Sequence, residues 1–110
     1  MPTIFEPNDL PVRSKDGATY TTLANTAMLG ADALQVERVA LDAGKKTEPA
    51  SAMGAERFVF VIQGTGQAQV GSETFPLAAE SMLWIESGDT FTLEAGAEQL
   101  EVLVCRAPAE

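Results

Sequence analysis

The sequence of 110 residues contains no histidine and a single cysteine. Without an imidazole the most common general base is missing, and neither a Ser-His-Asp nor a Cys-His arrangement can form. Cys105 has no partner for an internal disulfide, and no paired cysteines indicate a zinc site. We therefore expect a protein of a reducing compartment, the cytoplasm. Any catalytic group must come from the carboxylates, the lysines, Tyr20 or Cys105.

Basic residues are also scarce, with seven lysines and arginines against sixteen acidic residues and a net charge of -9. This charge repels a phosphate backbone, and the basic residues form no obvious cluster along the sequence, so we expect no nucleic-acid partner. No apolar run approaches the roughly 18 residues of a membrane span. The first ten residues lack the basic and apolar regions of an export signal. The sequence therefore predicts no membrane partner.

Short apolar runs separated by turn residues make up most of the chain. Their regular spacing is typical of a β-sandwich or barrel, so we predict an all-β fold. Three prolines among the first eleven residues favour an extended arm over residues 1–17, which packs on a single barrel of residues 18–110. The predicted strands are residues 18–23, 34–41, 57–63, 66–70, 73–77, 82–85, 90–93 and 100–105.

The most regular part of this pattern lies in the middle of the chain. Residues 58–62 are rich in Val, Ile and Phe and predict a buried central strand. Gly64, Gly66 and Gly71 tolerate positive φ, so residues 57–77 are predicted to fold as two successive hairpins. Residues 23–39 keep a second interpretation, because their Ala, Met and Leu side chains also fit one face of a helix, although Gly30 weakens it.

Between Gly44 and Ala95 the residue spacing resembles the two motifs of the cupin family, G-x5-H-x-H-x4-E-x6-G and G-x5-P-x-G-x2-H-x3-N. Gly44 and Gly64 stand at the two glycines of the first motif, and Gly88 stands at the turn glycine of the second. The resemblance implies a cupin-type double-stranded β-helix, an RmlC-like jelly-roll barrel that is commonly dimeric. It also implies a small-molecule site in the mouth of the barrel.

The metal-binding positions of these motifs carry other residues in this chain. Ala50 and Ala52 replace the two histidines of the first motif, Arg57 replaces its glutamate, and Phe91 replaces the histidine of the second motif. Two methyl groups, an aromatic ring and a permanent cation cannot ligate a divalent metal. We therefore expect a cupin-like chain with no metal and no cofactor.

Arg57 is the most informative of the replaced residues. Strand alternation sends Arg57 and Val59 to one face, which lines the cavity in the family register. A guanidinium there needs a carboxylate, phosphate or carbonyl partner. One hypothesis is an internal ion pair with a glutamate such as Glu37 or Glu101, or an arginine that reaches solvent at the strand end. The other is an anchor for an anionic or carbonyl-bearing ligand.

Aromatic residues suggest both a ligand wall and a contact between subunits. Trp84 and Phe91 fit an apolar wall of the pocket, but they also fit the core or a dimer interface. The opposite face of the central strand, with Phe58 and Phe60, is too apolar to leave against water, which predicts a homodimer. The predicted ligand-binding residues are Arg57, Ala50, Ala52, Phe91, Val59 and Trp84.

These features predict a metal-independent cupin-fold protein that holds a small polar or anionic molecule in the barrel cavity. As an enzyme it would carry out proton transfer of the isomerase or lyase type beside a carbonyl, with Glu86 or Tyr20 as the base and Arg57 stabilising the enolate oxygen. Two alternatives remain open. One is a sensor or carrier without turnover, and the other is a degenerate dimeric scaffold with a filled pocket.

Overall fold

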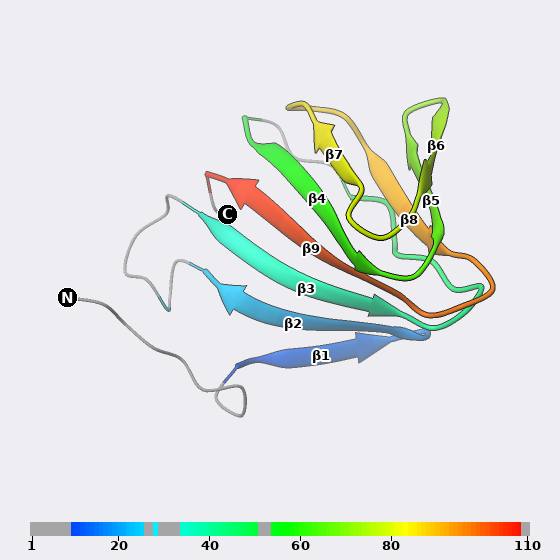
Figure 1. The fold of residues 1–110 in the computed structure, drawn as a ribbon. Coiled ribbons are helices and arrows are strands. Elements are labelled where there is room, and N and C mark those ends of the chain that lie inside the picture. Colours follow the sequence, from blue (N-terminus) through cyan, green and yellow to red (C-terminus); the bar gives the residue numbers. More distant parts are fainter. Residues whose placement is uncertain (1–9, 26–27, 29–33, 51–53, 109–110) are drawn as a thin grey trace.

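The computed structural model describes residues 10–25, 28, 34–50 and 54–108. Within them the chain forms two antiparallel sheets that face each other (Figure 1). The larger sheet has the strand order β1-β2-β3-β9-β4-β7 and the smaller one the order β6-β5-β8. The strands are β1 (Val12–Lys15), β2 (Ala18–Ala24), β3 (Gln35–Leu41), β4 (Glu56–Gln63), β5 (Gly66–Val70), β6 (Glu73–Leu77), β7 (Met82–Ile85), β8 (Phe91–Ala95) and β9 (Leu100–Ala107).

The predicted strands are confirmed, with bounds that shift by one or two residues, and an additional strand appears. Residues 12–15, which the sequence assigned to an extended arm, pair with β2 as the edge strand β1. The helical interpretation of residues 23–39 is wrong at both ends of that span, where β2 and β3 stand, whereas Met28, described between them, is helical. Its middle lies largely outside the described residues. No helix in the described part of the chain is long and apolar enough to cross a membrane.

One of the two predicted hairpins is present and the other is not. β5 and β6 pair across Gly71 and Ser72 as predicted. β4 and β5 do not pair, because the chain passes from the larger sheet to the smaller one at Gly64. Gly64 has a φ of +93°, and a Cβ there would lie 2.1 Å from the carbonyl oxygen of Gln99. The glycine is therefore required by a close crossing between sheets, which sequence alone does not distinguish from a hairpin turn.

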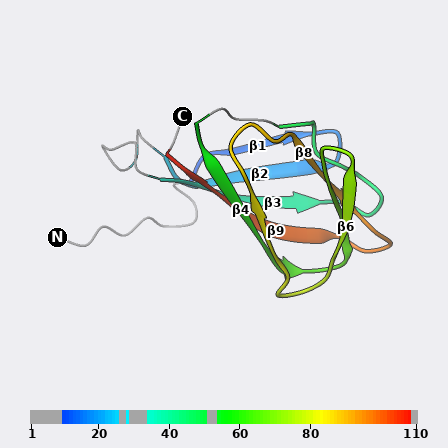
Figure 2. The same cartoon turned by 90° about the horizontal axis from the view of Figure 1, so that it is seen from above.

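Alternation along β4 separates the two faces of the larger sheet as predicted. Arg57, Val59 and Val61 are buried, whereas Phe58 and Phe60 are only partly so. The inward residues of both sheets form one core, made of Ala18, Val39, Leu41, Val59, Val61, Ala68, Leu77, Ile85, Phe91, Leu93, Ala95, Leu100 and Val102. Seen from above, the smaller sheet lies across the end of the larger one where β3 finishes and β9 starts (Figure 2).

The outer face of the larger sheet keeps an aromatic patch in contact with solvent. Phe58 pairs with Trp84 and Phe60 pairs with Met82 in the β4–β7 ladder. The Phe58 and Trp84 rings meet edge to face, with their centroids 6.0 Å apart. Met82 and Trp84 are 66% and 59% exposed, respectively. We call these four residues the outer aromatic patch.

Candidate functional site

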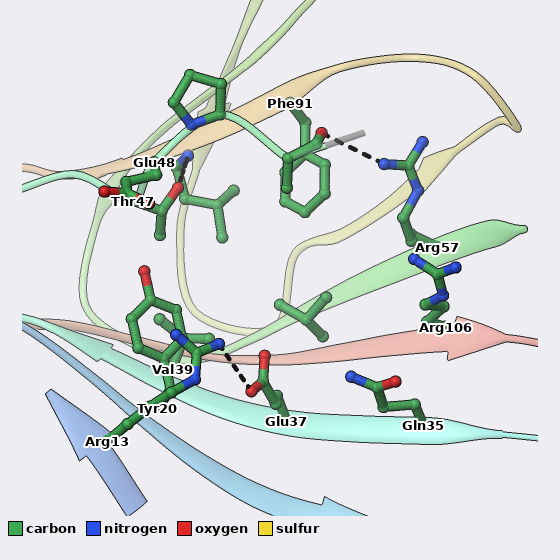
Figure 3. A pocket seen from close by; sticks show the side chains of 14 residues that line it. Arg13, Tyr20, Gln35, Glu37, Val39, Thr47, Glu48, Arg57, Phe91 and Arg106 are labelled. Atoms are coloured by element: carbon green, nitrogen blue, oxygen red, sulfur yellow. Dashed lines mark hydrogen bonds and ion pairs between the residues drawn. The ribbon is translucent and has the colours of Figure 1, made fainter. Parts of the chain in front are cut away.

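A pocket of about 440 Å³ opens between the two sheets. Its floor and one side come from the inner face of the larger sheet, and its other side comes from β8 and the segment 46–50 that runs along β8. Main-chain hydrogen bonds tie that segment down, because Ala50 and Phe91 exchange N–H···O bonds of 3.0 and 2.9 Å. The lining residues are Arg13, Tyr20, Gln35, Glu37, Val39, Thr47, Glu48, Pro49, Ala50, Arg57, Phe91, Leu93, Val104 and Arg106 (Figure 3).

The strand register arranges the lining residues of β3, β9 and β4 in rows, from a polar row at the open end to an apolar row at the floor. Gln35, Arg106 and Arg57 stand side by side on three neighbouring strands at the open end. Two residues further along the same strands, Glu37 stands beside Val104. The next row is apolar across β3, β9 and β4, with Val39, Val102 and Val61. Because side chains on one face recur every second residue, the polar groups of β3, β9 and β4 stand in the rows nearest the mouth. The row of Val39 continues on β2 and β1 with Tyr20 and Arg13, which also line the pocket.

Arg57 is 3% exposed, and main-chain carbonyl groups accept its hydrogen bonds. Its Nη2 donates to the carbonyl oxygens of Glu86 at 2.9 Å and Asp89 at 2.6 Å, and its Nη1 donates to that of Ala50 at 3.4 Å. The guanidinium also lies over the Phe91 ring, 5.4 Å from its centroid. Arg57 thus ties β4 to both the segment 46–50 and the turn before β8.

Neither form of the internal alternative for Arg57 describes this arrangement. The predicted ion pair with Glu37 or Glu101 is wrong, because Arg57 donates to carbonyl oxygens and Glu37 pairs with Arg13. An arginine reaching solvent is also wrong, since the side chain is buried. The Nε of Arg57 is buried and has no hydrogen-bond partner among the described residues. A buried N–H without an acceptor is costly, so Arg57 keeps one donor that the described protein groups leave unsatisfied.

Arg57 and Arg106 stand directly opposite each other in the β4–β9 ladder, and both line the pocket. Like charges at opposed positions of a sheet repel. Burial and the neighbouring Arg106 both lower the pKa of the Arg57 guanidinium, while Asp89 raises it. An anion placed between these two guanidinium groups would reduce their repulsion.

The far side of the pocket holds an ion pair and a phenol (Figure 3). Arg13 contacts Glu37 at 3.1 Å and lies over the Tyr20 ring, with its guanidinium carbon 4.0 Å from the centroid. Burial is the main cause that raises the pKa of Tyr20, so its hydroxyl is protonated at neutral pH. Lys15 forms an exposed ion pair with Glu48 at the rim. The two carboxylates of the lining are thus each paired with a cation.

Three of the four arginines in the chain line this pocket. The sequence predicted the pocket role of Arg57 but missed those of Arg13 and Arg106. Arg13 was assigned to the arm, and Arg106 lay just beyond the predicted last strand. The alternation of Val102, Val104 and Arg106 would have placed the latter on the inner face if that strand had been extended by one residue. Arg38, the fourth arginine, is exposed on β3 and does not line the pocket.

The sequence-predicted residues are partly brought together. Arg57, Ala50 and Phe91 line the pocket, whereas Val59 is fully buried in the core and is not part of the lining. Trp84 lies on the opposite face of the sheet, because it pairs with the outward Phe58. Ala52 falls outside the described residues.

The two predicted bases are also separated by the fold. Tyr20 lines the pocket, but Glu86 does not. The Glu86 side chain is exposed beside a different surface hollow, and its main-chain carbonyl is the group that faces Arg57. Glu86 is therefore in no position to act as a base in this pocket.

The cupin metal positions do not fit a metal ion in this chain. The two positions that are filled by Ala50 and Phe91 offer no lone pair, and Arg57 places a buried cation at a third. Within the described residues, no group of three or more Asp, Glu or Cys side chains is placed to hold a metal ion. The ionisable side chains that line the pocket are three arginines, one phenol and two carboxylates.

Comparison with known proteins finds matches in structure only. Neither family models nor curated protein sequences give a match. A predicted oxalate decarboxylase from Thermotoga maritima superposes with a TM-score of 0.84 at 15% identity, over 96% of this chain and 99% of that one. Streptomyces PAC13, solved with uridine, gives 0.82 at 16% identity, over 100% and 85%. A cupin-2 domain from Rhodospirillum rubrum gives 0.76 at 17% identity, over 96% and 74%. These similarities and the two antiparallel sheets show that the chain has the all-β cupin fold.

Proposed function

We propose that this chain is a metal-independent cupin-fold protein that binds a small anionic molecule in the pocket between its sheets. The observation that carries the proposal is the concentration of arginine. Three arginines and two glutamates line the pocket, although the whole chain has a net charge of -9. A locally positive site in an acidic protein favours an anionic ligand, because guanidinium groups bind carboxylate and phosphate through charge-assisted hydrogen bonds.

The size of the pocket supports a ligand rather than a filled scaffold. Small-molecule sites commonly have volumes of roughly 300–1,000 Å³, and this pocket measures about 440 Å³. The methyl group of Ala50 and the ring of Phe91 line this space without filling it. Among structures of similar fold, one is a predicted oxalate decarboxylase, one is an ectoine synthase and another was solved with uridine.

A proton-transfer enzyme is a second candidate, favoured by one observation. The phenol of Tyr20 and the carboxylate of Glu37 line the same pocket. Because burial raises the pKa of Tyr20, it would donate a proton rather than remove one. Glu37 would be the acceptor, in place of the Glu86 that the sequence suggested. Binding of an anion is common to both candidates and is the claim that can be tested first.

The test compares four compounds that differ in charge and in hydroxyl content: gluconate, hexanoate, sorbitol and 1-hexanol. We expect the two carboxylates at millimolar concentration to raise the melting temperature of the protein, while the two neutral compounds do not. Arg106→Gln should reduce this stabilisation by the carboxylates, because it removes half of the opposed guanidinium pair. Arg38→Gln is the matched control, since it removes the same charge from the outer face of the same sheet.

Two results would contradict the proposal. One is equal stabilisation by the neutral and the charged compounds. The other is an equal loss in Arg106→Gln and Arg38→Gln, which would mean that only the overall charge of the protein matters. Added salt up to about 0.5 M should weaken the shift only partly, because a partly buried ion pair is screened less than an exposed one.

A further inference from the structure

The polar groups of the pocket fall into two sets at opposite sides. Arg57 and Arg106 lie together on one side, and Tyr20 lies on the other near Arg13, Glu48 and Thr47 (Figure 3). Tyr20 is in register with Val39, which is in register with Val102, four residues before Arg106. With strands about 4.8 Å apart and about 3.4 Å per residue, the main chains at Tyr20 and Arg106 are separated by roughly 10 Å across the strands and roughly 13 Å along them.

The space between the two sets is mostly apolar, with Glu37 beside Val104 as its polar group. Val39 and Val104 form its floor on the larger sheet, and Leu93 and Phe91 face them from β8. A ligand that uses both sets must therefore have a body of several carbon atoms between its polar groups. Two long side chains, an arginine and a tyrosine, reach inward from the two ends and shorten the span.

The side of the pocket with Tyr20 selects a neutral hydrogen-bonding group. The Glu37 carboxylate can accept hydrogen bonds, and the protonated Tyr20 hydroxyl can donate one and accept others. A ligand ammonium would meet the Arg13 guanidinium, which is 3.1 Å from Glu37 and 4.0 Å from the centre of the Tyr20 ring. A second carboxylate would meet Glu37. A hydroxyl group avoids both repulsions.

We propose that the ligand is a small hydroxy acid, bound with its acidic group at Arg57 and Arg106 and with its hydroxyl groups at Tyr20 and Glu37. This inference rests on the proposed function, because it specifies the class of anion. Arg57 and Arg106 stand directly opposite each other and both line the pocket, so their guanidinium groups would flank the acidic end of the ligand. Both ends of the ligand then replace hydrogen bonds that it makes to water.

The test compares three of the same compounds by their hydroxyl content as well as by their charge. Their dissociation constants are measured by titration calorimetry. Gluconate carries an acid and hydroxyls, hexanoate carries only the acid, and sorbitol carries only hydroxyls. We expect gluconate to bind at least about tenfold more tightly than hexanoate, since each added hydrogen bond contributes about fivefold. Sorbitol should bind more weakly than gluconate by a larger factor.

Variants at each end separate the two contributions. Tyr20→Phe keeps the ring under Arg13 but removes the hydroxyl, so it should weaken gluconate about fivefold and leave hexanoate unchanged. Glu37→Gln tests the same end of the ligand by changing the carboxylate that accepts hydrogen bonds from its hydroxyl groups. Arg106→Gln should weaken both carboxylates. Far-ultraviolet circular dichroism and the melting temperature of each free variant show whether it is folded.

The outcomes distinguish this inference from the function on which it rests. If hexanoate binds as tightly as gluconate, or if Tyr20→Phe weakens both equally, the hydroxy-acid assignment is overturned while anion binding stands. If sorbitol binds as tightly as gluconate, the anionic function itself fails. If none of the three binds to the folded protein, both proposals fail.

Discussion

The two faces of the larger sheet come from the same strands but differ in almost every property. Along β9, Leu100, Val102 and Arg106 point inward to the core and the pocket, while Leu103 and Cys105 point outward. The inner face combines fully buried aliphatic side chains with buried or pocket-lining charge. The outer face carries partly exposed aromatic and aliphatic groups without a covering sheet. Hydrophobicity alone therefore does not identify the inner face. The alternation of side chains between the two faces along each strand does.

The largest expected difference between the faces concerns two leucines of one strand. Leu100 is fully buried and Leu103 is partly exposed on the opposite face. We expect Leu100→Ala to lower the free energy of unfolding by about 3 kcal/mol and Leu103→Ala by about 1 kcal/mol, because a cavity forms only at the enclosed site. Urea unfolding at low protein concentration measures both. Equal losses would show that the outer face is as enclosed as the core.

The face that each residue of a strand occupies is also what the sequence predicted best. The alternation of Arg57, Val59 and Val61 against Phe58 and Phe60 was readable and is confirmed, as are eight strands. What could not be predicted is which sheet each strand joins. β4 and β5 are consecutive and separated by glycines, yet they belong to different sheets because Gly64 passes beneath Gln99. That contact joins residues that are 35 positions apart, and no local pattern encodes it.

The site was predictable only where a single strand defines it. Arg57 was found because its own strand places it inward. Trp84 was assigned to the pocket but lies outside it. The face that Trp84 occupies depends on the register between β7 and β4. The pocket role of Arg13 depends on β1 joining the sheet, and proline-rich sequence before that strand favoured an irregular arm. Convergence of three arginines from three strands is a property of register, which a single sequence does not contain.

The second difference between the faces concerns buried and exposed arginine. Arg57 donates three hydrogen bonds to carbonyl oxygens, while Arg38 is exposed on the outer face. We expect Arg57→Met to lower the free energy of unfolding by about 2 kcal/mol, because it leaves the carbonyl of Asp89 without its donor. Arg38→Met should change it by less than about 0.5 kcal/mol. Thermal and urea unfolding of the two variants provide the comparison.

This pair of variants also separates two roles of Arg57. Its hydrogen bonds to the carbonyl oxygens of Glu86 and Asp89 indicate that Arg57 ties β4 to the turn before β8. If Arg57→Met is as stable as the original protein but no longer responds to carboxylates, then Arg57 acts as a ligand anchor alone. Loss of both stability and the carboxylate response is the result expected from the structure.

The smallest effect on the folded chain is expected at the outer aromatic patch, where the consequence is association rather than stability. A cluster of exposed aromatic and thioether side chains on one face favours contact with a second copy of the chain. We expect a homodimer at micromolar concentration, with a light-scattering mass twice that of the chain. Because each copy carries a net charge of -9, added salt should strengthen the dimer by screening their repulsion.

Trp84→Ser tests whether this patch is the interface. Trp84 is 59% exposed but contacts Phe58, so its removal should lower the unfolding free energy of the isolated chain by only about 1 kcal/mol. It should nevertheless convert the dimer to a monomer, because large aromatic residues dominate such contacts. Val12→Ser is the matched control, since Val12 is 61% exposed on β1 at the opposite edge of the sheet. A dimer that survives Trp84→Ser but not Val12→Ser would place the contact at the β1 edge. A monomeric mass for the original protein would mean that the exposed aromatic groups do not drive self-association.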